Sequence, residues 1–407
     1  MTGERNWAGN VEFTASRSSR PQTVGELQEI VSGAHGAGRP FKAIGARHSF
    51  SAVADTPGEL VSMVDLDRIV DIDHAAMEVT VEAGITYGAL GAELHEHGLA
   101  LANLPSLPHV TVGGAVATGT HGSGSANPCL AAAVRAIDYV GPTGQLNRWS
   151  RDVSEFHGAV IALGALGIAA HLTLDVEPTF DVTQVVYRDL PMGDALAHLD
   201  EIMGSAYSVS LFTDWQRDVF HQVWVKRRRA TGASTPEYHD AWLGLAPFAK
   251  PVHMVESLSA DSCSAQLGVP GPWHERLPHF RQAFTPSVGD ELQAEYFVDR
   301  ALGGEAIRRI HSIGPELAPL VLVSEIRSVA SDELWLSGSY GRDTIAIHFT
   351  FVDDEPAVMG ALRTIEAAID DLQPRPHWGK LAAMEPDQVQ SRFPRFDDFT
   401  ALVDAAR

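Results

Sequence analysis

The segment Thr344 to Phe351 alternates between apolar residues and polar or small ones, and this period of two constrains the fold more than any other feature of the chain. The alternate residues form one apolar face: Ile345, Ile347, Phe349 and Phe351. Because successive side chains of a strand point to opposite faces, His348 and Thr350 share the other face. The pattern predicts a β-strand that covers a core with one face and presents polar groups on the other.

The same alternation occurs around Glu325 and Arg327, which therefore share one face of a second predicted strand. If the two strands lie near each other, one sheet face carries a carboxylate, a guanidinium, an imidazole and a hydroxyl group. Lys380 follows in the turn-rich segment 374–380. Such a cluster suits a polyhydroxylated ligand, because each ligand hydroxyl needs a hydrogen-bond partner. The alternative is an ordinary antiparallel sheet with one solvated face.

The rest of the second half favours a sheet covered by helices. From about residue 179 onward, strand patterns occur at 180–187, 208–212, 222–225, 293–297 and 320–327. Helical patterns occur at 194–203, 305–313 and 356–372. An antiparallel sheet with helices on one face, an α+β architecture, is the natural interpretation. The one basic run, Lys226 to Arg229, is interpreted as a solvated strand end or turn.

In the first half, strands alternate with helices, which suggests an α/β unit. A helix is predicted over Thr23 to His35, where Thr23 and Glu26 have the spacing of a capping box. A second helix is expected over about Tyr87 to His97. Strand patterns occur at 41–44, 60–64, 77–81 and 167–176, and a hairpin is predicted over 134–149. A domain boundary is expected near residue 178, where the pattern changes.

The segment Leu104 to Gly124 is rich in Gly, Ser, Thr and Pro, and we predict a long ligand-facing loop there. Its last part, T-G-T-H-G-S-G at 118–124, offers backbone N–H groups that suit a diphosphate where no Lys/Arg cluster is present. A flexible surface loop is the alternative. The sequence has no G-x-G-x-x-G opening a helix after a strand and no P-loop, so a nicotinamide Rossmann domain and a P-loop site are not indicated.

The charge balance disfavours several classes of partner. With 30 Lys and Arg against 52 Asp and Glu, the net charge is −22, a poor match for nucleic acid or an anionic membrane. Two cysteines and the lack of a signal-peptide core or a bilayer-length apolar stretch favour a cytoplasmic protein. His274 to His279 resembles a zinc-protease motif, but the second histidine comes one position late and Pro278 would break the helix. No metal site is expected.

Several ordered sequence blocks, each weak alone, together point to a known family. They include N-W-A-G-N at 6–10, G-A-R-H-S-F at 45–50, S-L-P-H at 106–109, A-T-G-T-H-G-S-G at 117–124, G-A-L-G at 164–167, E-I-R at 325–327, H-F-T at 348–350 and H-W-G-K at 377–380. Across nearly the whole chain, the sequence resembles the alditol oxidases (xylitol or sorbitol oxidases). These are a branch of the vanillyl-alcohol-oxidase-like flavoproteins close to the sugar-1,4-lactone oxidases.

The resemblance implies an FAD-binding domain over residues 1–178, built from two α/β subdomains, and a substrate-binding domain over 179–407 with a large antiparallel sheet flanked by helices. The last segment, about 375–407, is expected to pack back toward the flavin. His48 matches the histidine that carries the flavin through an 8α covalent bond. Other residues match flavin-contacting positions: Ala43, Ile44, Gly45, Ala46, Arg47, Ser49, Ser106, Thr111, Gly114, Thr118, His121, Gly122, Ile168 and Ala169.

The resemblance also implies oxidation of the terminal primary alcohol of an alditol (xylitol, sorbitol or glycerol) to the aldose, with O2 reduced to hydrogen peroxide. The implied substrate pocket consists of Ser106, Gln293, Glu325, Arg327, His348, Thr350 and Lys380. Catalytic roles are expected for Lys380, Arg327, Glu325 and His348. Arg327 and Lys380 would stabilise the developing alkoxide. The proton acceptor is either His348 with Glu325 or a Lys380 of lowered pKa.

Two other functions are weighed against this one. The first is an aldonolactone oxidase, or a dehydrogenase that uses another electron acceptor. The second is a non-catalytic polyol-binding or scaffolding protein that holds no flavin. One departure from the family pattern is Arg47, which stands where many relatives have glycine. We expect a monomer whose partners are a polyol and O2, with neither nucleic acid nor a membrane among them.

Overall fold

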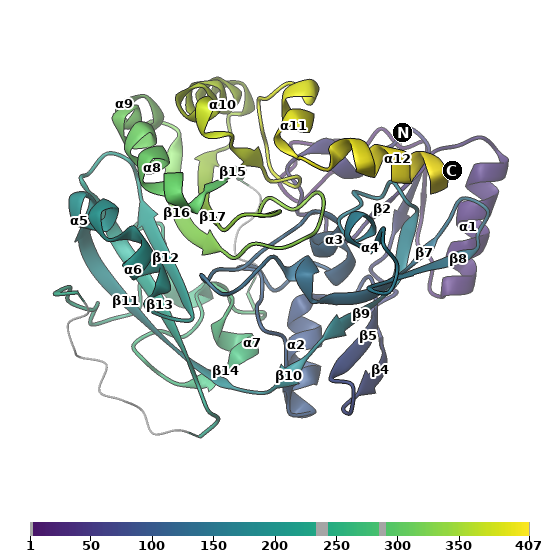
Figure 1. The fold of residues 1–407 in the computed structure, drawn as a ribbon, viewed down its shortest axis with the longest axis horizontal. Coiled ribbons are helices and arrows are strands. Elements are labelled where there is room, and N and C mark those ends of the chain that lie inside the picture. The colour runs from purple at the N-terminus through teal and green to yellow at the C-terminus, as the bar shows by residue number, and fades with distance from the viewer. Residues whose placement is uncertain (1–2, 233–242, 285–289, 407) are drawn as a thin grey trace.

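The computed structural model describes residues 3–232, 243–284 and 290–406 and places the two halves of the chain side by side (Figure 1). The first half contains a parallel sheet in the order β1 (Arg17–Ser19), β3 (Glu59–Ser62), β2 (Phe41–Ile44). It also contains an antiparallel sheet in the order β4 (Ile69–Asp73), β5 (Glu78–Glu82), β9 (Ile168–Asp175), β7 (Val134–Val140), β8 (Leu146–Ser150). Its helices are α1 (Val24–Gly36), α2 (Tyr87–Glu96), α3 (Val112–Ala117) and α4 (Phe156–Ala159). Two sheets with helices agree with the two subdomains expected.

Helix α1 begins as the sequence predicts. The Thr23 side chain accepts a hydrogen bond from the backbone N–H of Glu26 at 3.1 Å, which satisfies one of the free donors of the first turn. The Glu26 carboxylate accepts from the N–H of Gln22 at 2.8 Å rather than from that of Thr23, so the reciprocal half of the cap reaches one residue further back.

The segment 104–124 differs from the predicted long loop, because it contains α3. The Thr111 side chain caps this helix by accepting from the N–H of Gly114 at 3.3 Å. The small residues that suggested a loop are the ones that let a short helix lie close to its neighbours. A Cβ on Gly113, for example, would come within 2.8 Å of Ala83.

The second half is built on one eight-stranded antiparallel sheet, in the order β14 (Gly271–Pro272), β11 (Asp181–Pro191), β13 (Val219–Arg229), β12 (Ser208–Thr213), β16 (Val321–Val329), β17 (Thr344–Val352), β15 (Glu291–Asp299), β18 (Arg375–Pro376). Its helices are α5 (Met192–Ala197), α6 (Leu199–Gly204), α7 (Trp273–Arg276), α8 (Gly303–Ser312), α9 (Gly314–Leu317) and α10 (Glu355–Ile369). Short 3₁₀ helices cover Ala52–Ala54, Leu130–Ala133, Ala260–Ser262, Arg300–Leu302 and Asp370–Leu372. The predicted α+β architecture is confirmed.

The apolar face of β17 packs as its alternation predicts. The four side chains at 345, 347, 349 and 351 are fully buried in one core with residues of α6, α8 and α10. Burying apolar area stabilises the fold by about 25 cal/mol per Å². The opposite face of the sheet is therefore left for the polar side chains.

Two predictions in this half are wrong in detail. The helix expected over 194–203 is interrupted at His198, so α5 and α6 form in its place. The solvated strand end predicted for the basic run is correct for Arg227 to Arg229, which pair only with β11, but wrong for Lys226, which has paired strands on both sides. Lys226 lies opposite Gln184 and Ser208 and is 1% exposed.

The last described segment crosses from the second half to the first. After β18, the chain forms α11 (Pro386–Arg392) and α12 (Phe396–Ala406), which run along the top of Figure 1 toward the first half. Phe399, Leu402 and Val403 lie in the same core as Phe156 of α4. β6 (Leu99–Ala100) and β10 (Glu177–Pro178) also pair where the halves join, and the division into domains near residue 178 stays a prediction.

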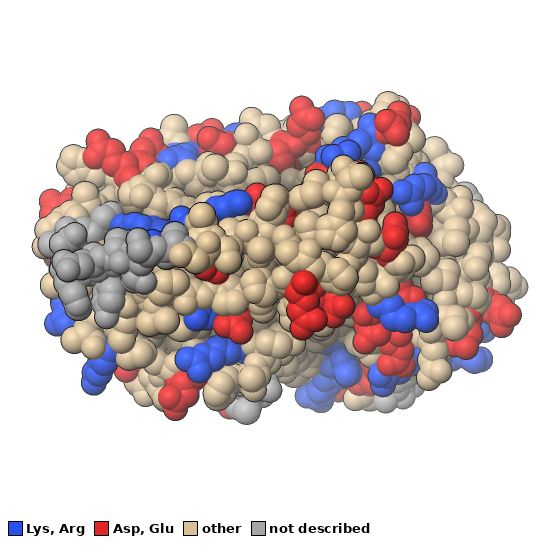
Figure 2. Space-filling view, turned by 90° about the horizontal axis from the view of Figure 1, so that it is seen from below, with Lys and Arg blue, Asp and Glu red and all other residues tan. Residues whose placement is uncertain are grey.

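Charges are mixed on the described surface that Figure 2 shows, where blue Lys and Arg side chains are scattered among red Asp and Glu side chains. Within the described ranges, no helix has both the length and the apolarity needed to cross a bilayer. In the same ranges, no group of three or more His, Cys, Asp or Glu side chains is arranged to hold a metal ion.

Candidate active site

A cavity of about 790 Å³ is lined by residues from both halves of the chain, a size typical of ligand sites. All but one of the predicted cofactor and substrate residues line it. The exception is Gly122, which packs against Asn103; a Cβ there would come within 2.3 Å of the Asn103 amide. A flavin contact of Gly122 therefore stays a prediction.

His48 lies on the loop that follows β2, and close packing fixes this loop. A Cβ on Gly45 would come within 2.0 Å of the Thr111 hydroxyl, so only glycine lets the loop lie against the cap of α3. The N–H of Trp7 donates to the carbonyl of Arg47 at 2.9 Å, and the Trp7 ring lies 4.9 Å from the His48 ring.

The His48 side chain is neutral at physiological pH. Burial, together with the nearby charges of Lys380 and His109, lowers its pKa to about 4. A neutral imidazole keeps a nitrogen lone pair that can form a bond to carbon.

Arg47 adopts a left-handed backbone conformation with φ of 62°. This region favours glycine, because a Cβ there approaches the backbone closely. Its guanidinium lies 3.7 Å from the carboxylate of Glu4. The departure from the family pattern at this position therefore has a conformational cost.

The polar face of the eight-stranded sheet also lines the cavity. Strands β16 and β17 are direct neighbours, with Glu325 opposite His348, and β17 pairs with β15 so that Gln293 lies opposite Thr350. The two strands that the alternation predicts are thus adjacent, and their polar residues meet as expected.

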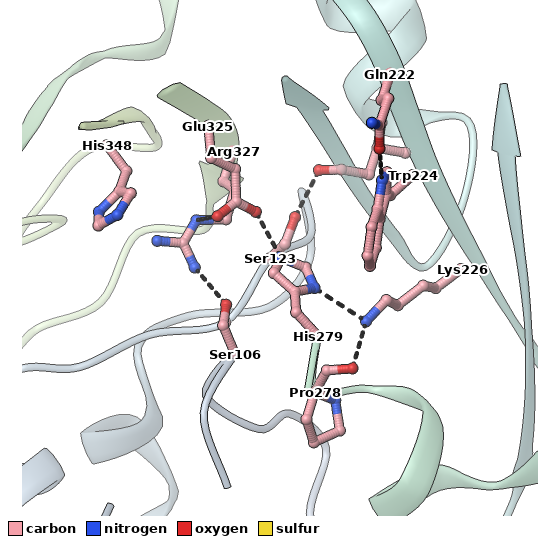
Figure 3. A network of polar contacts seen from close by, with 12 residues as sticks. Ser106, Ser123, Gln222, Trp224, Lys226, Pro278, His279, Glu325, Arg327 and His348 are labelled. Carbon is pink, nitrogen blue, oxygen red and sulfur yellow. Dashed lines mark hydrogen bonds and ion pairs between the residues drawn. The ribbon is translucent and has the colours of Figure 1, made fainter. Parts of the chain in front are cut away.

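Arg327 is the centre of the charge network on this face. Its guanidinium donates to Glu295 Oε1 at 2.6 Å and to the Ser106 hydroxyl at 3.3 Å, and its Nε lies 3.6 Å from Glu325 Oε2. Figure 3 shows the contacts with Ser106 and Glu325. A buried cation between two carboxylates is compensated, and its geometry is fixed.

Glu295 was missed in the sequence, although it alternates with Gln293 on a predicted strand. Its Oε1 lies 3.1 Å from His121 Nε2, and its Oε2 lies 3.7 Å from His348 Nδ1. Burial opposes ionisation, but Arg327 and His121 outweigh it and hold the pKa of Glu295 well below its ordinary value. The alternation with Gln293 would have placed it on the polar face.

Lys380 reaches this face from the turn after β18. Its ammonium donates to the Gln293 amide oxygen and lies 5.0 Å from the centre of the Phe50 ring. Burial lowers the pKa of Lys380 to about 8, with the Glu295 charge acting in the opposite direction. The N–H of Phe50 donates to the carbonyl of Gly379 at 2.7 Å, which ties this turn to the His48 loop.

Two further histidines were not predicted. His279 Nε2 lies 2.8 Å from Glu325 Oε1, and burial lowers the pKa of this imidazole. His377 stacks on Phe297, and burial lowers the pKa of His377 to about 3. His279 was considered only as the end of a failed zinc motif, and His377 only as part of a family block.

Comparisons with known proteins give relatives along the whole chain. Residues 16–150 match the family model of an FAD binding domain, and residues 290–406 match that of D-arabinono-1,4-lactone oxidase. An alditol oxidase of a Streptomyces species is 44% identical over 98% of this chain and 94% of its own. An L-gulono-1,4-lactone dehydrogenase of Mycobacterium tuberculosis is 28% identical over the same shares.

The fold is also found among solved structures. A solvent-stable cholesterol oxidase superposes with a TM-score of 0.78 over 99% of this chain and 94% of its own. At 16% identity, this likeness concerns the fold alone.

The residues present fit FAD. The cavity lining includes small residues that leave room for a ligand: Ala43, Gly45, Ala46, Gly113, Gly114 and Ala117. The neutral imidazole of His48 and the ammonium of Lys380 line the same cavity. Together with 44% identity over 98% of its length, this places the chain in the alditol oxidase family of FAD-binding oxidoreductases.

Proposed function

We propose that this chain oxidises the terminal primary alcohol of an alditol, such as xylitol or sorbitol, to the aldose and reduces O2 to hydrogen peroxide. The observation that carries the proposal is the polar sheet face, where Glu325, Arg327 and His348 line the same cavity as the His48 loop. A chain of hydroxyl groups needs alternating donors and acceptors, and this face supplies both.

FAD, when bound, supplies the two-electron acceptor that takes a hydride from the carbinol carbon. We propose that it is attached through His48, whose neutral imidazole suits the 8α bond. The chain's own residues then have to orient the alcohol and handle its proton.

We assign proton acceptance to His348. Burial lowers the pKa of its imidazole, so the ring is neutral and able to accept. The Glu295 carboxylate, 3.7 Å from its Nδ1, would stabilise the imidazolium that forms. Lys380 and Arg327 remain cations and stabilise the developing alkoxide.

A substrate panel tests the proposal. Purified protein loaded with FAD is mixed without oxygen with xylitol, sorbitol, glycerol and gulono-1,4-lactone, and the loss of the flavin's visible absorbance is followed. We expect the alditols to reduce the flavin, and peroxide to form once air is admitted. Reduction by the lactone alone would refute alditol oxidation.

Lactone oxidation is the second candidate, because residues 290–406 match the D-arabinono-1,4-lactone oxidase family. Peroxide would distinguish an oxidase from a dehydrogenase. The proposal includes a monomeric, cytoplasmic protein, and the free, buried thiols of Cys129 and Cys263 fit a reducing compartment.

A further inference from the structure

Lys226 is a buried cation behind the proposed substrate face. Its ammonium donates to the backbone carbonyls of Leu277 and, at 3.1 Å, Pro278. The third partner is His279, whose Nδ1 lies 3.3 Å away (Figure 3). An ammonium has three N–H donors and no acceptor, so these three contacts use it completely.

This arrangement fixes the proton of His279. Because the ammonium can only donate, Nδ1 of His279 must accept, and the ring proton is then on Nε2. Nε2 lies 2.8 Å from Glu325 Oε1 and donates to it. The other oxygen of Glu325 is left to face Arg327 at 3.6 Å.

Both the backbone and the ring of His279 are fixed by their neighbours. Its backbone N–H donates to the carbonyl of Ser106 at 2.9 Å, and its carbonyl accepts from the N–H of Ser264 at 2.8 Å. The ring meets Trp224 edge-on with centroids 5.1 Å apart, and Phe212 at 5.9 Å. An imidazole so fixed transmits its orientation to the carboxylate it contacts.

We propose that His279, held by Lys226 as the Nε2–H tautomer, is a positioning residue that fixes Glu325 against Arg327 in the polyol site. The proposal rests on the proposed function, because only there does Glu325 contact a substrate. Neither His279 nor Lys226 needs to touch the polyol.

The hydrogen bond between His279 and Glu325 is expected to depend on pH, because Lys226 can lose its proton. Burial lowers the pKa of Lys226 to about 7; the charge of Glu325 opposes this shift, as Cys263 does when ionised, and the charge of Arg327 adds to it. Once Lys226 loses its proton, its neutral amine no longer requires Nδ1 of His279 to accept. The ionised Glu325 alone then keeps the ring proton on Nε2, so the tautomer and the position of His279 are fixed by one group in place of two.

Lys226→Met tests the inference, with the exposed Lys250→Met as matched control. Each holoenzyme is mixed with xylitol without oxygen, from one pH unit below the pKa of Lys226 to two above it. At the lowest pH we expect flavin reduction to be about ten- to a hundredfold slower in Lys226→Met than in wild type. This ratio should shrink toward one as pH rises, because wild type loses the same contact.

A second variant, His279→Gln, tests the inference even if Lys226→Met disturbs the packing around position 226. In His279→Gln the side-chain amide can still donate to Glu325 but has no second tautomer. In this background, the ratio of flavin-reduction rates with and without Lys226→Met should therefore not change with pH. Nitrogen-15 NMR of labelled histidines, with the His279 resonances assigned from this variant, should show an unprotonated Nδ1 below the pKa of Lys226.

A ratio that stays constant with pH, or a protonated Nδ1 at low pH, would overturn the inference. Failure of the proposed function looks different. In that case xylitol leaves the wild-type flavin oxidised at every pH, while the tautomer seen by NMR is unaffected.

Discussion

Glu295→Gln removes one charge from the centre of the site without changing the size of the side chain. Arg327 then loses the carboxylate at 2.6 Å and keeps only that of Glu325, 3.6 Å from its Nε. Breaking a buried ion pair costs about 3 to 5 kcal/mol, and the remaining carboxylate points to the lower end, about 3 kcal/mol. For a chain of 407 residues this lowers the melting temperature by about 3 to 4 °C.

The pH dependence of this loss has a definite sign. The folded-state pKa of Glu295 is depressed, so its ionisation stabilises the fold above the pKa of the unfolded chain, which is near the ordinary value of 4.5. That contribution disappears as pH falls through the folded pKa. The difference in melting temperature between wild type and Glu295→Gln should therefore be full at neutral pH and shrink below 4.5.

Thermal unfolding, followed by circular dichroism on protein with the same flavin content, measures this difference. Glu316→Gln, at an exposed position on α9, is the matched control and should change the melting temperature little. If Glu295→Gln melts with wild type at all pH values, Glu295 does not compensate Arg327 and the electrostatic argument is refuted.

Three further predictions concern single side chains. His48→Ala should leave the flavin removable, so that acid precipitation releases the yellow colour into the supernatant; colour kept in the pellet would place the link elsewhere. Lys380→Met should retain the flavin but slow its reduction by xylitol about 10²- to 10³-fold, as measured by anaerobic mixing, and a near-normal rate would remove Lys380 from the catalytic residues. Arg47→Gly should raise the unfolding free energy by about 1 kcal/mol in denaturant titration, because glycine takes the left-handed backbone at φ of 62° without strain; a loss of stability would contradict this.

Much of the second half could be predicted because alternation is a local property. The period of two places His348 and Thr350 on one face before any partner strand is known, and it does the same for Glu325 and Arg327. Only the adjacency of the two strands had to be seen in the structure. The residues alone make the loop ending at His48 a candidate for ligand binding, and the family resemblance adds the role of His48 in flavin attachment.

The missed residues depend on contacts between distant parts of the chain. Lys226 belongs to a basic run that is normally solvated, and only pairing on both sides of β13 buries it. His279 lies outside any strand, 46 residues before the Glu325 that it contacts. Contacts between residues so far apart in the sequence leave no local periodicity, so the roles of Lys226 and His279 could not be predicted from the sequence.

The crossing of the last described segment has a consequence for how the protein is made. The Ser51 hydroxyl donates to the carbonyl of Trp378, a residue 327 positions later. At about 5 to 20 residues per second, a ribosome needs roughly 15 to 65 s to add that stretch. The His48 loop thus waits while these 327 residues are added, and the complete site, with any flavin held in it, forms only after the segment that carries Lys380 has left the ribosome.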